Sequence, residues 1–220
     1  LGVAENAALI QAANYEEHLA LLAGCDLVIE AIAERMDWKL DLYKKIAPHV
    51  APHAILASNT SVIPITKIME GLKHRERALG THWWNPPYLV PLVEVIGTPW
   101  TAPAVIETTM ALHKAIGKTP VHVKKDVAGF VGNRLQHALW REAIALVEHG
   151  ICDAATVDAV IKASFGRRLA VLGPLENADL VGTDLSLAIH NTVLPAIDSR
   201  PGPSPYLEKL VKDGKLGFKS

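Results

Sequence analysis

Two side chains able to form an acid–base pair stand in the stretch GTHWWNPPYLVPLVEV, residues 80–95. His82 precedes two tryptophans, and Glu94 comes near the end of an apolar run. An imidazole exchanges protons near neutral pH, and a carboxylate on its second ring nitrogen would orient it as a general base. A strand, a turn through Asn85-Pro86-Pro87 and a returning strand could bring the two together. The spacing fits equally a histidine packed in the core and a charge at a sheet edge, so both interpretations stay open.

Other polar residues follow apolar runs at points where strands are expected to end. They are Glu34 after VIEAIA, the run Ser58-Asn59-Thr60-Ser61 after AILA, and Asn85 beside His82. Ligands of open parallel sheets bind beyond the carboxyl ends of the strands. Each polar end alone is typical of a simple turn, but three in succession favour a site along one edge of the sheet.

Several familiar motifs are missing from the sequence. It holds no G-x-G-x-x-G, no G-x-x-x-x-G-K-[ST] phosphate loop and no G-x-S-x-G hydrolase elbow. His49 and His53 have a helical spacing, but the prolines beside them preclude a helix, so no metal site is predicted. Gly129 and Gly132, in AGFVGNRL, are expected to let a helix start close against a strand.

The elements that would position these residues alternate through the first half of the chain. After an apolar, strand-like segment at 8–14, a capping box of Asn14 and Glu17 predicts a helix that stops at Gly24. Further strands are predicted over 25–33, 54–59, 77–84, 92–97 and 119–125, with helices over 35–47, 64–71 and 101–117. This alternation indicates a parallel α/β sheet with helices on its faces.

The pattern changes after Lys125, beyond which no strand signal returns. Amphipathic helices are expected over 128–150, 153–166, 177–197 and 204–214, most of them stopping at glycine. We therefore expect two domains, an α/β unit at 1–125 and an all-α unit at 126–220.

Composition narrows the class of protein. The 220 residues are 50% hydrophobic, which is ample for a core, and they carry a net charge of −1. This balance gives no reason to expect nucleic acid or an anionic membrane as a partner. Cys25 and Cys152 form no motif, and no membrane span or signal peptide is recognisable, so we expect a soluble, cytoplasmic protein. The chain starts at Leu1 without methionine and stops without a closing element, which indicates a fragment of a longer protein.

Five stretches of the chain together resemble a known family. CDLVIEAIAER, ILASNTS, HWWNPP followed by LVEVI, KDVAGFVGNRL and GPLENADLVGTD occur in the order found in the 3-hydroxyacyl-CoA dehydrogenases. The resemblance covers essentially the whole chain and implies a partial, Rossmann-type NAD-binding domain at 1–125 and an all-α dimerisation domain at 126–220. It also implies that the chain begins after the family's first βαβ unit, so that the glycine-rich phosphate loop and the ribose-binding acid are absent.

The resemblance also implies roles for individual residues. His82 would be the general base that takes the hydroxyl proton as hydride leaves for NAD, and Glu94 would hold its imidazole. Ser61 and Asn133 would hydrogen-bond the substrate oxygens. The cofactor contacts would come from Ala31, Glu34, Lys39, Ser61, Asn85 and Lys219.

Three functions are open on this basis. The leading one is NAD-dependent oxidation of an L-3-hydroxyacyl-CoA to the 3-oxoacyl-CoA, as in fatty acid β-oxidation, by a homodimer. The second is oxidation of a free 3-hydroxy acid such as carnitine or gulonate. Trp83 and Trp84 stand where commoner family members carry two phenylalanines, and the residues after them, PPYLVPLVEV, are more similar to relatives that oxidise such small acids. The third is that the 220-residue chain alone is a non-catalytic dimerising fragment, since without the phosphate loop it should bind NADH weakly.

Overall fold

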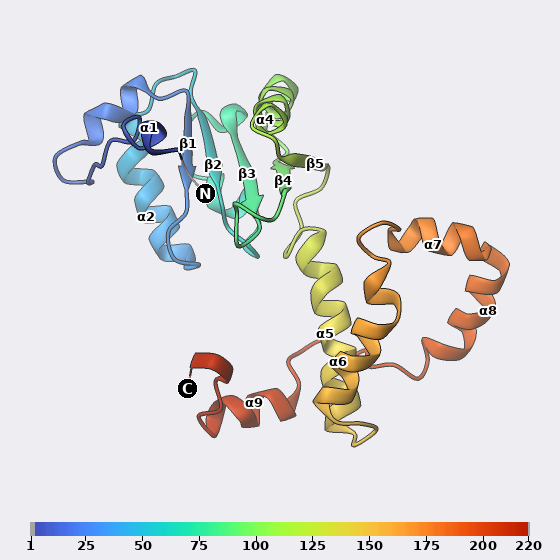
Figure 1. Ribbon diagram of the computed structural model, residues 1–220. Coiled ribbons are helices and arrows are strands. Elements are labelled where there is room, and N and C mark those ends of the chain that lie inside the picture. The colour runs from blue at the N-terminus through green and yellow to red at the C-terminus, as the bar shows by residue number, and fades with distance from the viewer. Residues whose placement is uncertain (1–2, 220) are drawn as a thin grey trace. The chain divides into compact units, whose positions relative to one another are not determined.

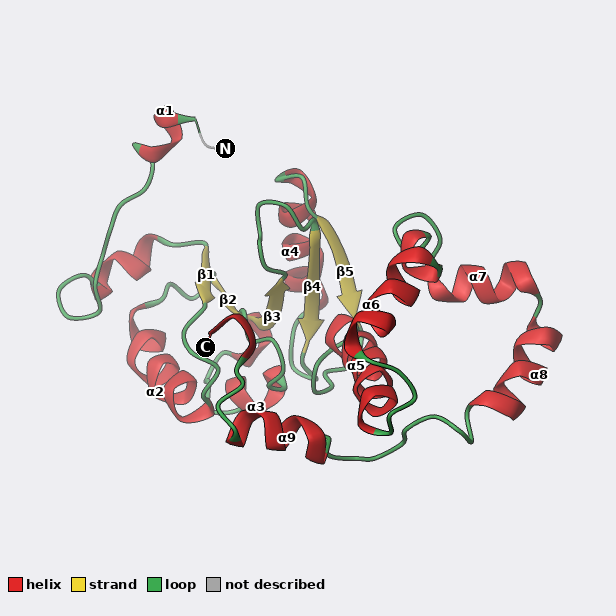
Figure 2. Ribbon diagram, turned by 60° about the horizontal axis from the view of Figure 1, so that its bottom comes forward, coloured by secondary structure: helices red, strands yellow, loops and turns green. Residues whose placement is uncertain are grey.

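A sheet of five strands forms the centre of the first of two compact units. The computed structural model describes residues 3–219, and the division between the units falls after Arg134. Within the described part of the first unit the strands are β1 (Leu27–Glu30), β2 (Ile55–Ser58), β3 (Ala78–Trp83), β4 (Leu92–Gly97) and β5 (Thr119–Val123). They lie side by side in this order, as Figures 1 and 2 show.

The strands do not all run in one direction. β1, β2 and β3 are parallel, whereas β4 is antiparallel to β3, and β5 is parallel to β4. The expectation of an all-parallel sheet is therefore wrong at β4. The loop 84–91 contains no helix that could cross over the sheet, so the chain returns directly beside β3 as an antiparallel neighbour.

Helices pack on both faces of this sheet. They are α2 (Met36–Ile46), α3 (Ile65–Met69) and α4 (Pro103–Ala115). Because side chains alternate along a strand, Leu56 of β2 joins the core cluster that contains Ile46 and Ile68 of α2 and α3. Its neighbour Ile55 belongs to a second cluster, against which Val105 of α4 packs. The two clusters thus cover the two faces of the sheet.

The segment before β1 departs from the sequence prediction. Here α1 (Ala4–Ala7) is short, residues 8–14 form no strand, and the predicted helix at 14–24 is a turn followed by a 3-10 helix, Leu19–Gly24. The capping box forms only in part: the Asn14 side chain accepts the backbone N–H of Glu17, but the backbone N–H of Asn14 donates to His18 and not to the Glu17 carboxylate. The three-residue period of a 3-10 helix brings Leu19 and Leu22 to the same side, against the core.

The second unit contains helices and, between residues 135 and 219, no strand. Its helices are α5 (Gly132–Glu148), which begins in the first unit, α6 (Ala154–Ala163), α7 (Pro174–Val181), α8 (Thr183–Val193) and α9 (Pro205–Lys212). Asp153 and Ser204 cap α6 and α9 as predicted, since each side chain accepts a backbone N–H of the first turn. The helical segment expected at 177–197 is split, because Gly182 adopts a φ of +104° that no helix allows.

Candidate active site

The antiparallel register of β3 and β4 sets His82 directly opposite Glu94. Nδ1 of the imidazole lies 2.7 Å from Oε2 of the carboxylate. The two residues are only 4% and 1% exposed. Because β4 lies between β3 and β5, Glu94 is not a charge at a sheet edge. The returning strand that the sequence suggested therefore joins the two residues in a buried pair.

The Glu94 carboxylate is surrounded by hydrogen-bond donors. Oε1 accepts the backbone N–H groups of Val131 and Gly132, at 2.9 and 3.0 Å. Oε2 accepts the indole N–H of Trp84 at 3.4 Å in addition to the bond with His82. Burial raises the pKa of Glu94, but the hydrogen bonds from these groups outweigh it and hold the pKa below its ordinary value.

These bonds determine which nitrogen of His82 carries the proton. An ionised carboxylate only accepts hydrogen bonds, so Nδ1 of His82 must donate to Glu94. In the neutral ring this leaves Nε2 as the acceptor, which is the tautomer that a general base requires.

Aromatic rings and a close backbone approach surround the imidazole. The ring centroids of Trp84 and Phe130 lie 5.5 and 5.6 Å from that of His82. A Cβ atom at Gly132 would come within 2.4 Å of the Trp84 indole, so only glycine lets the start of α5 approach this ring. The close approach expected at this glycine exists, and its neighbour is the tryptophan just beyond β3.

Glu34 lies past the carboxyl end of β1 and ties the loop after β2 to it. Its Oε1 accepts the backbone N–H groups of Ser61 and Val62 at 3.1 and 3.0 Å, together with the hydroxyl of Thr60. Burial raises the pKa of Glu34, but the hydrogen bonds from Thr60 and Val62 and the charge of Lys39 have the larger effect. The pKa of Glu34 is therefore below its ordinary value. Glu34 is exposed, and one of its two carboxylate oxygens, Oε1, accepts all of these hydrogen bonds from the loop after β2.

Lys39 has a different place from the one the sequence suggested. Its side chain is fully buried, and Nζ lies 2.7 Å from Oε1 of Glu30 and 3.5 Å from Oε2 of Glu34. Glu30 is held in turn by the hydroxyl of Ser58 at 2.5 Å. The structure does not support the direct cofactor contact predicted for Lys39, because its side chain has no exposed surface.

Two of the predicted substrate-binding residues are joined. The amide Nδ2 of Asn133 donates to the carbonyl oxygen of Ser61 at 2.8 Å, so the first turn of α5 is bonded to the loop after β2. Ala31, after β1, and Asn85, after β3, are both exposed beside the same strand ends. Lys219 is exposed in the second unit, at the end of the 3-10 helix Gly217–Lys219.

Sequence patterns missed several residues that shape the site. The buried pair of Glu30 and Lys39 left one signal, a glutamate interrupting an apolar strand, because a buried charge needs a partner. Phe130 left none, although it is fully buried next to His82 and adopts a φ of +48°. Asn59, by contrast, was among the polar residues that the sequence singled out. Its side chain accepts the backbone N–H of Trp83 and so connects the ends of β2 and β3.

Residues 3–219 contain neither a cluster of metal ligands nor a helix suited to a membrane. No group of three His, Cys, Asp or Glu side chains there could hold a metal ion. In that same part of the chain, no helix combines the length and the apolar character that crossing a membrane requires. Cys25 and Cys152 are both free thiols.

The exposed groups at the strand ends fit the sugar and amide parts of a dinucleotide. Glu34 presents a carboxylate oxygen, Ser61 a hydroxyl and Asn85 an amide at the edge where open α/β sheets bind ligands. They lie past the ends of β1, β2 and β3, and β3 also carries His82. The fold and the site together define an α/β protein with a buried histidine–glutamate pair, next to the strand ends where open sheets of this kind bind ligands.

Family models identify which enzymes of this class the chain resembles. The model described as 3-hydroxyacyl-CoA dehydrogenase, NAD binding domain, matches residues 3–127, and that of the C-terminal domain matches residues 129–220. The chain belongs to the 3-hydroxyacyl-CoA dehydrogenase family. Its fold is the expected one, a Rossmann-like domain followed by a helical domain, and the cofactor is NAD.

Characterised relatives differ in their named substrates. The chain is 37% identical over 221 residues to the 5-formyl-3-hydroxy-2-methylpyridine 4-carboxylate 5-dehydrogenase of Mesorhizobium japonicum, covering 100% of this chain and 72% of the relative. It is 40% identical over 162 residues to an L-carnitine dehydrogenase of a Pseudomonas species, covering 74% and 50%. A probable 3-hydroxybutyryl-CoA dehydrogenase of Bacillus subtilis is 40% identical over 196 residues, covering 89% and 67%. The chain thus spans only half the length of one of these relatives.

A solved structure agrees with the first of these relatives. The crystal structure of a 5-formyl-3-hydroxy-2-methylpyridine 4-carboxylic acid 5-dehydrogenase, described as an NAD⁺-dependent dismutase, matches with a TM-score of 0.89 and 38% identity. The match covers 93% of this chain and 66% of that one.

Proposed function

We propose that the protein is an NAD-dependent dehydrogenase in which His82 takes the proton of a substrate hydroxyl group. The observation that carries this proposal is the 2.7 Å bond between Nδ1 of His82 and Glu94, which leaves Nε2 as the proton acceptor. Glu94 would stabilise the imidazolium that forms, because its pKa is held low and it stays ionised. When bound, NAD supplies the acceptor for the hydride.

The other predicted residues would position substrate and cofactor. Ser61 and Asn133 are bonded to each other, which favours a shared role in holding the substrate oxygens. Glu34, Ala31 and Asn85 would contact the cofactor at the strand ends. Lys39 would act through Glu34, which it supports from beneath, and a cofactor contact of Lys219 stays a proposal.

For the substrate, we favour a small free carboxylic acid that carries the reacting carbon. Two features support this choice. The relative from Mesorhizobium japonicum, whose named substrate is a pyridine carboxylate, matches over the whole of this chain. Trp84 and Phe130 also set two aromatic rings next to His82, a surrounding that suits a small flat molecule.

An L-3-hydroxyacyl-CoA is the second candidate. The family's name and the relative from Bacillus subtilis favour it. A substrate panel on the protein in its natural full length separates the two. It compares the pyridine carboxylate, L-carnitine and free 3-hydroxybutyrate with L-3-hydroxybutyryl-CoA, following NADH formation. Turnover of a free acid at a higher kcat/KM than the CoA ester is expected, and preference for the ester would overturn this choice of substrate.

The role of His82 is tested separately with a matched control. His82→Ala should lower kcat by about 10²–10⁴-fold, the usual contribution of a general base. His113→Ala removes another buried histidine, whose Nδ1 bonds only the Thr109 carbonyl oxygen in α4, and should leave kcat unchanged. Equal kcat in the His82 variant and the parent would show that this histidine is structural.

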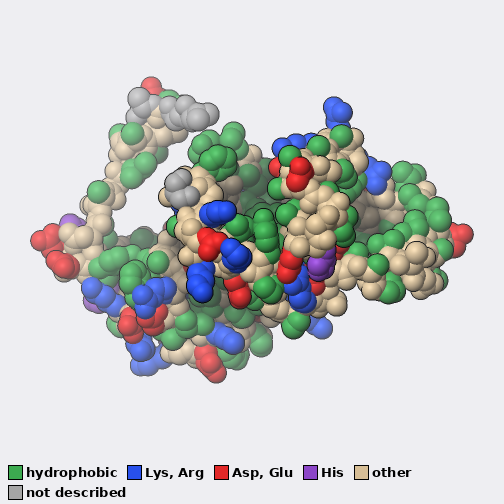
Figure 3. All heavy atoms as spheres, turned by 90° about the horizontal axis from the view of Figure 1, so that it is seen from below, with side chains coloured by type: hydrophobic (Ala, Val, Ile, Leu, Met, Phe, Trp, Pro, Cys, Tyr) green, Lys and Arg blue, Asp and Glu red, His purple; other side chains and the backbone are tan. Residues whose placement is uncertain are grey.

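We also propose that the protein is a homodimer joined through its helical domain. Apolar side chains are exposed over α7 and α8, among them Leu175, Leu180 and Leu187, and Figure 3 shows apolar atoms at the surface of this region. A contiguous apolar surface is a common mark of an interface. Sedimentation of Leu180→Glu is expected to show less dimer than the parent protein.

A further inference from the structure

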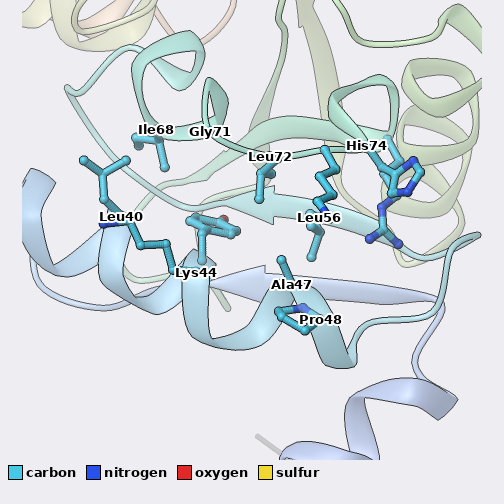
Figure 4. Close-up of a pocket in the computed structure, with 12 residues that line it drawn as sticks. Leu40, Lys44, Ala47, Pro48, Leu56, Ile68, Gly71, Leu72 and His74 are labelled. Atoms are coloured by element: carbon cyan, nitrogen blue, oxygen red, sulfur yellow. The ribbon is translucent and has the colours of Figure 1, made fainter.

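A cavity of about 360 Å³ lies between α2, α3 and β2, apart from the histidine site. Leu56 lies near the start of β2 and Arg77 directly precedes β3, so the cavity is at the amino ends of the strands. The His82 site lies at the opposite edge of the sheet, where β1, β2 and β3 end. Figure 4 shows Leu40, Leu56 and Leu72 around this space. Its volume is at the lower end of the range for small-molecule sites, about 300–1,000 Å³.

The charged groups of this α2–α3 cavity are all basic. Lys44, Lys73, His74 and Arg77 line it, and no Asp or Glu does. Lys44 and His74 have carboxylate neighbours outside the lining, at 3.5 and 3.2 Å. Lys73 and Arg77 form no ion pair within the described residues. The other residues that line the cavity are mostly apolar, so the cavity combines apolar walls with an excess of basic side chains.

Arg77 is the most buried of these basic residues, and the adjacent Glu76 interacts with it electrostatically without forming an ion pair. It is 7% exposed, and its Nη1 donates to the carbonyl oxygens of Ala51 and Ala54. Its Nε is buried without a hydrogen-bond partner. A guanidinium keeps its charge in proteins, and a buried charge without a partner is unfavourable. The other buried cation, Lys39, has its carboxylate in Glu30.

We propose that the α2–α3 cavity binds a free monocarboxylate with a medium-length alkyl chain. The alkyl chain would lie among the leucine side chains, and the carboxylate would pair with the basic groups around Arg77 and Lys73. Charge complementarity selects an anion, and the apolar walls select a tail, so an amphiphile satisfies both. This inference does not rest on the proposed dehydrogenase function, because the cavity shares no residue with the His82 site.

Calorimetry on the whole protein, with four probes, tests the two halves of this recognition. Octanoate should bind at one site, and butanoate more weakly by about fourfold for each methylene removed. Octanol, which has the tail without the charge, and acetate, which has the charge without the tail, should each bind at least tenfold more weakly than octanoate. Octanol binding as tightly as octanoate, or no detectable octanoate binding, would overturn the proposal.

Matched glycine variants locate the site. Gly71 lines the cavity and Gly24 does not, and a Cβ at either position meets nothing within 4 Å. Gly71→Leu should therefore fill the cavity and weaken octanoate binding at least tenfold, whereas Gly24→Leu should bind as the parent does. Lys73→Met, which leaves the bonds of Arg77 intact, should weaken octanoate binding but not octanol binding. Equal octanoate affinity in both glycine variants would show that the ligand binds elsewhere and would refute the assignment.

Discussion

Replacing Glu94 by glutamine should reverse which nitrogen of His82 carries the proton. Glutamine has the same shape, so its Oε1 can keep the bonds from the backbone N–H groups of Val131 and Gly132. Its amide nitrogen then takes the place of Oε2, 2.7 Å from Nδ1, and an amide nitrogen only donates. Nδ1 must accept, so the ring proton moves to Nε2 and the acceptor for the substrate hydroxyl is lost.

The size of the effect follows from these contacts. Loss of a general base lowers kcat by about 10²–10⁴-fold, which raises the barrier by roughly 3–5 kcal/mol. Hydrogen bonds to charged groups contribute about 1.5–3 kcal/mol each, against about 0.5–1.5 for neutral ones. The two retained bonds to residue 94 should therefore weaken by about 2 kcal/mol together, and the Trp84 indole N–H, which would then face an amide N–H, loses its acceptor at a cost of about 1 kcal/mol. These losses are below the ordinary stability of a domain, about 5–15 kcal/mol, so the variant should remain folded.

Nitrogen NMR of the His82 imidazole shows which tautomer is present and needs no substrate. The value of kcat with the best substrate of the panel measures how well His82 acts as a general base. Asp126→Asn is the matched control, since its Oδ2 accepts one backbone N–H, from Thr66 at 2.6 Å, and contacts no histidine. It should lose stability but neither change the His82 tautomer nor lower kcat. A Glu94→Gln protein that keeps its proton on Nδ1, or that turns over at the parental rate, would refute the reasoning.

Three further perturbations test the surroundings of the site. Trp83→Phe removes an indole N–H that is buried without a partner, whereas Trp84→Phe removes a donor to Glu94, so urea unfolding should show the Trp84 variant to be less stable by about 1 kcal/mol. The reverse order would contradict the assigned hydrogen bond. Lys39→Met should lower the free energy of unfolding by about 3–5 kcal/mol, because Glu30 is left buried and unpaired. Addition of Glu30→Gln should recover part of this loss, and no recovery would argue against the pairing. The lowered pKa of Glu94 favours the folded state above the ordinary value of 4.5, so its contribution should disappear as pH falls below that value. Thermal unfolding against pH should then show the parent and Glu94→Gln proteins converging in acid, and a constant difference would count against the ionised carboxylate.

The sequence predicted the five segments that form β1 to β5, besides a strand-like one at 8–14 that forms none, but it did not give the direction of every strand. Apolar runs identify β1 to β5 because buried strands leave a local pattern, whatever their neighbours. Direction depends on the connection, and the loop 84–91 is too short for a crossover helix. The predicted strand–turn–strand path through Asn85 did imply the direction of β4, because an antiparallel β4 sets Glu94 opposite His82.

The hydrogen bonds that hold Glu94 and Glu34 in place could not be predicted from sequence patterns, and the reason is physical. Glu94 accepts the backbone N–H groups of Val131 and Gly132. Glu34 accepts the backbone N–H groups of Ser61 and Val62, and in both cases the donors lie far from the carboxylate in the chain. A backbone N–H is present at nearly every residue and leaves no mark in the sequence. Only the glycine at 132 gave a signal, because its missing Cβ makes room for Trp84.

These contacts also bear on where the catalytic unit ends. The sequence placed the end of the first domain at residue 125, but Glu94 takes two of its hydrogen bonds from residues 131 and 132. Asn133 adds a third connection, to the loop carbonyl of Ser61. A chain cut at 125 would keep His82 and Glu94 yet leave Oε1 of that carboxylate without the donors that hold its pKa low. The orientation of the His82–Glu94 pair therefore depends on the start of α5, and residues 131–133 lie within the compact unit that extends to Arg134.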